Sequence, residues 1–425
     1  MCFVYGNLRD DFLYGLSNFF NTGKQPPCAS LNMRRALDEH RKRLAKKGVT
    51  YSEIIKPSDE PREKTKKHVS NAFFTLETEA HYNVATEISD GVNTIRCDDS
   101  GDDVVYIHYI DRTMSAGDDS KIPLICPNCS HHADASTFSG GCPMCGTRFK
   151  IDDLYPCVNA CYTKAYLMPS QTGRPVLKKG LLALKIGGGI ALGIAILSFL
   201  IMIMFGTEVL KALATANGVF VGSSVISTGI LWLIFYTIYS VKSTAGGIRM
   251  TAREIDMRST VDTGKRMEAV ICPLDPFFTY DVFEGKILSI VRTIAYSDNR
   301  NNCSFYCGND DLMFMDDLVD IRYRGGVEFT RADIVGDYLH VLVTLYLDNV
   351  YYRDRQFIRK KENFRLELVR NRSVKTNPVF TAYSTNCPHC GASFDSVLTK
   401  TCPVCGSGFE LAGQDWTIVR ILRTA

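Results

Sequence analysis

A chain of 425 residues exceeds the usual size of a single hydrophobic core and predicts two or more folded units. Its composition, with 45% hydrophobic and 22% charged residues, excludes a disordered or fibrous protein. The net charge of +3 argues against a dedicated nucleic-acid binder, because such proteins usually carry a strong excess of positive charge.

The first predicted region, residues 1–70, contains a basic helix and a linker. The segment MRRALDEHRKRLAKKG, residues 33–48, is typical of a helix, and PSDEPREKTKK after it is typical of a solvated linker. A basic cluster of this kind can bind anionic lipid headgroups near a membrane. We favour a simple solvated helix face, because acidic residues lie among the basic ones.

Residues 71–170 are predicted to form an α+β region that carries a zinc ribbon at 126–149. Four cysteines with spacers of two, twelve and two residues define this ribbon: Cys126, Cys129, Cys142 and Cys145. A spacer of two lets a tight turn aim both sulfur atoms at one point, and two such turns complete the tetrahedron that zinc prefers. Four thiolates leave no open coordination position, so we predict a structural Zn2+ and not a catalytic one.

Two apolar segments follow and predict a transmembrane helical hairpin over residues 181–241, with spans at about 185–206 and 219–241. The stretches 186–207 and 212–241 contain no charged residue, and each is long enough to cross the bilayer. Basic residues flank the hairpin on its outer sides. The pattern predicts an integral membrane protein with both termini cytoplasmic, and a buried pair of core helices is the alternative.

Residues 265–425 are predicted to form a second α+β domain with an inserted zinc ribbon at 387–409. Apolar residues recur at intervals of four, three and four within 275–294, which indicates a helix with one buried face. Strands are expected at 327–334, 338–352, 364–369 and 416–422. A helix followed by long antiparallel strands is typical of a layer in which the helix packs on a curved sheet.

The second ribbon contains another cysteine quartet, with spacers of two, eleven and two residues: Cys387, Cys390, Cys402 and Cys405. Its first turn, CPHC, is also a redox sequence, but redox use needs one pair at a helix start within a βαβ unit. Disulfides are a third alternative, which a cytosolic setting disfavours. The two quartets together predict two structural Zn2+ ions.

The two halves of the chain resemble each other after their ribbons. CGTRFKIDDLYPCVNACY follows the first ribbon and parallels CGSGFELAGQDWTIVRI, which follows the second. Both segments begin with CG-x-x-F and carry an aromatic residue near an acid. We therefore hypothesise that the first half is a diverged copy of the second.

Several motifs of residues 265–425 resemble one known family. DPFF at the predicted helix, the CPHCGASFD and CPVCG ribbon and the closing QDWTIVRI are similar to bacterial zinc-ribbon members of the translocase-of-inner-membrane subunit 44 family. The resemblance implies a conical α+β fold of the nuclear-transport-factor-two type. It also implies a membrane-associated role in protein transport, or a lipid-facing adaptor.

No catalytic constellation is evident, so we predict a non-enzymatic protein. His340 lies within a predicted strand, and three aspartates lie at predicted strand ends, where acids usually meet solvent: Asp333, Asp337 and Asp348. Phosphate-binding loops, nucleophile elbows and HExxH helices do not occur in the sequence.

The leading hypothesis is a membrane-anchored protein whose zinc-stapled cytoplasmic domains bind a partner in protein transport or as an adaptor. Its partners would be the lipid bilayer and other membrane or translocation proteins. The alternative is a membrane-tethered zinc-ribbon regulatory module that binds nucleic acid or a transcription partner. A third hypothesis is a small-ligand receptor or enzyme that uses the pocket of the cone.

Overall fold

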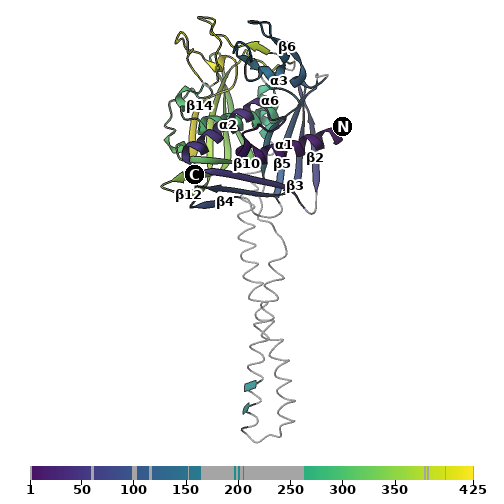
Figure 1. Ribbon diagram of the computed structural model, residues 1–425, viewed down its shortest axis with the longest axis vertical. Helices are drawn as coiled ribbons and strands as arrows, with labels where there is room; N and C mark the ends of the chain where they lie inside the picture. Colours follow the sequence, from purple (N-terminus) through teal and green to yellow (C-terminus); the bar gives the residue numbers. More distant parts are fainter. Residues whose placement is uncertain are drawn as a thin grey trace. The chain divides into compact units, whose positions relative to one another are not determined.

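A computed structural model describes most of the chain. The described residues are 2–58, 62–97, 103–113, 117–151, 153–163, 263–377, 382–397 and 399–424, with Ile196, Leu197, Leu200, Ile201, Met204 and Phe380. Apart from the five isolated positions between 196 and 204, they belong to one compact unit formed by Met1–Leu167 and Ser259–Ala425. Strands predominate in this unit (Figure 1).

The first half begins with two helices, α1 (Cys2–Thr22) and α2 (Leu31–Lys47). The Ser30 side chain caps α2 by accepting a hydrogen bond from the Met33 N–H, and Gly48 ends the helix in the left-handed conformation. An antiparallel sheet of order β1-β3-β5-β9 follows, and β2 and β4 also pair with β3. Its strands are β1 (Thr50–Pro57), β2 (Glu63–Val69), β3 (Phe73–Ser89), β4 (Thr94–Arg96), β5 (Asp103–Arg112) and β9 (Cys157–Thr163).

The second half repeats this plan with helices α6 (Thr263–Ile271) and α7 (Tyr280–Tyr296) and an antiparallel sheet of order β10-β11-β12-β14. Its strands are β10 (Leu318–Val335), β11 (Tyr338–Arg353), β12 (Gln356–Asn371) and β14 (Thr417–Thr424). The predicted helix and strands of this half are confirmed. The apolar residues at the predicted helical spacing are buried in its core: Phe283, Ile287, Ile290 and Ile294.

Each half inserts its ribbon at the same point of its sheet, between the third and fourth strands of the path. The first ribbon lies between β5 and β9, and the second between β12 and β14. Each of these two strand pairs also contains one register shift, at His108/Tyr109 and at Glu367/Leu368. This shared topology supports the hypothesis that one half is a diverged copy of the other.

Short elements lie within and beside the ribbons. These are β6 (Pro123–Ile125), β7 (His132–Asp134), α3 (Ala135–Phe138), β8 (Phe149–Ile151) and β13 (Ala382–Ser384). The described residues also include the 3-10 turns η1 (Asp119–Lys121), η2 (Arg300–Asn302), η3 (Met313–Met315) and η4 (Leu411–Gly413). Antiparallel pairing of β8 with β13 joins the first ribbon to the second, so the two ribbons lie side by side.

The two halves share one packed core. One buried cluster joins Leu44, Val49 and Ile88 of the first half to Val319 and Val350 of the second. Helix α2 packs against α7 as part of the same contact. The burial of apolar side chains from both halves therefore holds residues far apart in the sequence in a single unit.

The predicted fold class is wrong in its main features. We expected two α+β domains joined by a transmembrane helical hairpin, the second of them a conical helix-on-sheet domain. Instead, strands predominate among the described residues, and both halves contribute to one compact unit. The expected linker at 57–67 also differs, because β2 begins within it and pairs with the long strand β3.

The predicted membrane placement is also corrected. We predicted an integral membrane protein with two spans and cytoplasmic termini. Among the described residues, no helix combines the length and the apolar character needed to cross a bilayer. The two predicted spans, 185–206 and 219–241, lie outside the described residues except for the five isolated positions named above.

Candidate functional site

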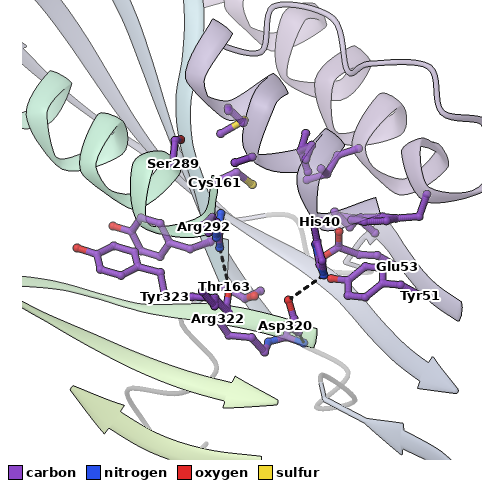
Figure 2. Close-up of a pocket in the computed structure, with 18 of the residues that line it drawn as sticks. His40, Tyr51, Glu53, Cys161, Thr163, Ser289, Arg292, Asp320, Arg322 and Tyr323 are labelled. Carbon is purple, nitrogen blue, oxygen red and sulfur yellow. Dashed lines mark hydrogen bonds and ion pairs between the residues drawn. The ribbon is translucent and has the colours of Figure 1, made fainter. Parts of the chain in front are cut away.

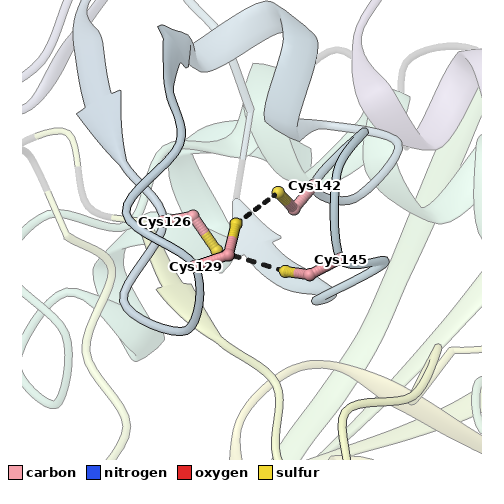
Figure 3. Close-up of side chains that lie close together, drawn as sticks. All are labelled: Cys126, Cys129, Cys142 and Cys145. Carbon is pink, nitrogen blue, oxygen red and sulfur yellow. Dashed lines mark hydrogen bonds between the residues drawn. The ribbon is translucent and has the colours of Figure 1, made fainter.

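The first candidate metal centre lies in the ribbon between β5 and β9. Cys126 Sγ lies 3.6 Å from Cys145 Sγ, and Cys129 Sγ lies 3.6 Å from Cys142 Sγ. Figure 3 shows the four side chains converging on one point. Four sulfur atoms bound tetrahedrally to zinc at about 2.3 Å lie about 3.8 Å from one another, whereas a disulfide needs about 2.05 Å. The observed distances fit a metal site and not a pair of disulfides.

The second candidate centre has the same geometry. Cys387 Sγ lies 3.6 Å from Cys405 Sγ, and Cys390 Sγ lies 3.7 Å from Cys402 Sγ. In each group the four sulfur atoms all lie within 4.8 Å of one another. The structure thus brings the eight predicted ligands together in two groups, each of which could hold one zinc ion. Four sulfur ligands close the coordination sphere, so such an ion would be structural.

Each pair of cysteines lies in the same backbone turn. The residue after the second cysteine donates its N–H to the carbonyl oxygen of the first cysteine, with N to O distances of 2.8 Å to 2.9 Å. Three of these residues are glycines with positive φ: Gly146, Gly391 and Gly406. Ser130 holds the fourth position with a φ of 58°, although side chains disfavour this conformation. The turn aims both sulfur atoms of a pair at the metal position.

Hydroxyl groups beside the sulfur atoms favour the thiolate form that binds metal. Thr147 Oγ1 lies 3.0 Å from Cys145 Sγ, and Ser407 Oγ lies 3.0 Å from Cys387 Sγ. The hydrogen bonds from these hydroxyl groups lower the pKa of both thiols to about 6. Zinc binds the thiolate, so these two thiols are the ones that ionise first in their ribbons. Burial and the neighbouring thiols raise the pKa of Cys129 and Cys390 to about 12.

A pocket between the two halves is a second candidate site (Figure 2). The volume of the pocket is about 100 Å³. Apolar side chains from the first half form part of its wall, among them Leu16, Phe20, Met33 and Ile55. Its polar residues come from both halves: His40, Tyr51, Glu53, Arg292, Asp320 and Arg322.

His40 and Asp320 lie close together in this pocket. His40 Nε2 donates to the Val319 carbonyl oxygen over 2.6 Å and lies 4.0 Å from Asp320 Oδ1. Arg322 Nη1 lies 3.7 Å from Asp320 Oδ2. Burial lowers the pKa of His40 to about 3 and raises the pKa of Asp320 to about 7. Near neutral pH the histidine is therefore neutral, and Asp320 can gain or lose a proton.

This pair is not among the predicted site residues. His40 lies in the basic segment that we expected to be a solvated helix, yet it is buried. A signal was present, because Met33, Leu37 and Leu44 recur with His40 at helical spacing and mark a buried face. Asp320 lies in a part of β10 that precedes the predicted strand, and nothing in the sequence relates it to His40.

The residues that we weighed as catalytic groups from the sequence lie outside this pocket. His340 Nδ1 lies 3.0 Å from Glu367 Oε1 on the neighbouring strand β12, on a partly exposed face. Asp333 and Asp337 are exposed. Asp348, expected at the solvent, is fully buried and accepts two hydrogen bonds from the Arg359 guanidinium. The structure does not bring these residues together in one site.

No family model, curated protein or solved structure matches this chain. The resemblance to the translocase subunit family therefore stays a prediction that rests on the motifs in the sequence.

Proposed function

We propose that this chain is a non-enzymatic adaptor that binds two structural zinc ions and uses its paired ribbons to hold a protein partner. The observation that carries the proposal is the exposure of Met144 and Val404, each with 71% of its surface accessible. The two residues occupy the same place in CPMC and CPVC, the second turn of each ribbon. A protein partner could bury these two exposed apolar side chains.

The four cysteine turns carry no charge outside their sulfur atoms. CPNCS, CPMCGT, CPHCG and CPVCGS contain neither lysine nor arginine, and neither aspartate nor glutamate. Nucleic-acid binding depends on basic side chains that contact phosphates, so these turns favour a protein partner. The same composition weighs against the alternative of a regulatory module that binds nucleic acid.

Zinc would make this surface rigid. Binding of zinc to four cysteines supplies roughly 10–16 kcal/mol at neutral pH, which can order a segment too small for a core of its own. Pairing of Ala382 with Ile151 and of Ser384 with Phe149 then couples one ribbon to the other. A surface that is ordered before binding loses less entropy when a partner docks.

The partner's class follows from the sequence resemblance. Members of the translocase subunit family act in protein transport, so we propose a translocation protein or a polypeptide in transit as the partner. This part of the proposal depends on the motifs at 275–278, 387–406 and 414–421.

Photo-crosslinking in living cells tests the proposal. A photoreactive amino acid replaces Met144 or Val404, and Val92, which is 85% exposed and lies in a turn of the first half, serves as the control position. We expect one defined protein to be captured from both ribbon positions and not from position 92. Recovery of nucleic acid, or identical products from all three positions, would contradict the proposal.

A further inference from the structure

A second cavity lies between the two halves, at the start of α7. Arg112 and Tyr155 line it from the first half, and Thr279, Arg370 and Trp416 line it from the second. The volume of this cavity is about 90 Å³. A space of this size suits a compact chemical group and not a large ligand.

Arg112 is a buried cation with spare hydrogen-bonding capacity. Its side chain is largely enclosed, since the residue is only 4% exposed, and its guanidinium lies 4.8 Å from the centre of the Tyr155 ring. Asp119 Oδ2 is 3.7 Å from Arg112 Nη1, which is too far for a hydrogen bond. Within the described residues, Arg112 Nε and Nη1 have no hydrogen-bond partner.

Arg370 lines the same cavity and, like Arg112, is buried with a donor that has no partner among the described residues. It is 5% exposed, and its guanidinium lies 4.5 Å from the centre of the Trp416 ring. Its Nη2 donates to Asp275 Oδ2 over 2.8 Å, which holds the side chain in place. Its Nε has no hydrogen-bond partner in the part of the chain that the structure describes.

The acceptors at this cavity are already engaged. Asp153 accepts from the Leu31 N–H over 2.8 Å, and Asp415 accepts from Lys286 and from the Trp416 N–H, each over 2.7 Å. Over the described residues, the buried side-chain atoms of this cavity that lack a partner are all donors. A group that completes the site must therefore supply acceptors.

The N-terminus of α7 also lies at this cavity, and its first N–H, that of Tyr280, already donates to Glu268 Oε1 over 2.9 Å. Thr279 is the N-cap residue of this 17-residue helix, but its side chain does not cap the helix and instead bonds to Ser70 Oγ over 2.8 Å. A helix N-terminus carries partial positive charge and favours anions. Lys286 and Lys375 also line the cavity.

We propose that this cavity binds an oxyanion, in particular a phosphate group, between Arg112 and Arg370. The partnerless nitrogen atoms of the two arginines, Nε and Nη1 of Arg112 and Nε of Arg370, can each donate one hydrogen bond, and the several oxygen atoms of a phosphate can accept them together. None of the residues that line this cavity belongs to the cysteine turns of the ribbons. Its occupation would tie β5 of the first half to β12 of the second, so phosphate would stabilise the contact between the halves.

Thermal unfolding and calorimetry of the zinc-loaded full chain test the proposal, with inorganic phosphate as the probe and chloride at matched ionic strength as the reference. We expect a saturable rise in Tm with phosphate, and at least tenfold weaker binding in Arg112→Gln and in Arg370→Gln. Arg331→Gln, at an exposed arginine on β10, should bind phosphate as the unchanged chain does.

A second variant and a second ligand complete the experiment. If a glutamine variant fails to fold, Arg112→Lys retains the charge but not the fork of donors, and we expect it to bind phosphate more weakly. Phosphoserine replaces phosphate in a parallel titration, and tighter binding of phosphoserine would assign the site to a phosphorylated side chain instead of the free ion. A phosphate effect that does not saturate, or that survives in all arginine variants, overturns the proposal.

Discussion

The imidazole ring of His40 stacks on the ring of Tyr296, with centroids 4.2 Å apart and planes 9° from parallel. His40 lies in α2 of the first half, and Tyr296 is the last residue of α7 in the second. One turn further along α2, Arg43 donates to the carbonyl oxygens of Ala295, Tyr296 and Ser297. The carbonyl groups at the C-terminal end of a helix have no N–H donor within the helix. A cation there donates hydrogen bonds to them and also interacts favourably with the negative end of the helix dipole. Helix α2 thus joins the two halves.

Replacement of Arg43 by alanine tests this contact between α2 and the end of α7. The change leaves several buried carbonyl oxygens without donors, so we expect the free energy of unfolding to fall by about 2–4 kcal/mol. Lys42→Ala is the matched control, because Lys42 is exposed and pairs with Glu39 of its own helix. Its effect should stay within about 0.5 kcal/mol. Equal effects of the two changes in a urea titration would argue against the joint.

The pocket predicts a specific dependence of stability on pH. The pKa of Asp320 is about 7 in the folded chain and about 3.9 when unfolded, so the folded state binds more protons between these values. The contribution of Asp320 to the free energy of unfolding therefore falls as pH rises from about 4 to about 7 and is constant above that range. Asp320→Asn removes this fall.

The measurement is the difference in unfolding free energy between Asp320→Asn and the unchanged chain, at a series of pH values. It should grow with pH by a few kcal/mol between about 4 and 7 in favour of the variant. Asp333→Asn, at an exposed aspartate, should show no such trend. A difference that is flat across this range would mean that Asp320 ionises as an ordinary carboxyl group.

Ser130 offers a test of the ribbon turns. Because its φ of 58° suits glycine, Ser130→Gly should stabilise the first ribbon by about 1 kcal/mol. The converse change, Gly391→Ser in the second ribbon, should cost a similar amount. Competition for zinc against a chelator measures both effects. If Ser130→Gly weakens zinc retention, the shared turn geometry is not what holds the metal.

The sequence allowed parts of this architecture to be predicted because their signals are local. Zinc ligands repeat at short spacing, and the periodic apolar residues from Phe283 to Ile294 indicate a helix without reference to any other segment. Strand β2 was missed for the opposite reason. Its residues are all exposed and rich in lysine, and only pairing with β3 makes it a strand.

The joint between the halves and the two cavities could not be predicted. The hydrogen bond from His40 to Val319 connects residues 279 positions apart, and no periodicity or motif relates them. The same holds for Arg112 and Arg370, which approach one cavity from different sheets. Long-range packing decides such contacts, and a single sequence shows only that a residue such as His40 lies on a buried helix face.

The central claim, that two closed cysteine sites hold structural zinc, is tested most directly by the metal content of the purified chain. Elemental analysis by mass spectrometry should give two zinc ions per chain, one after Cys126→Ser, one after Cys387→Ser and none in the double variant. Cys307→Ser, at an exposed cysteine outside both groups, should retain two. A wild-type chain without zinc, or two zinc ions that survive the loss of Cys126 and Cys387, would contradict the account.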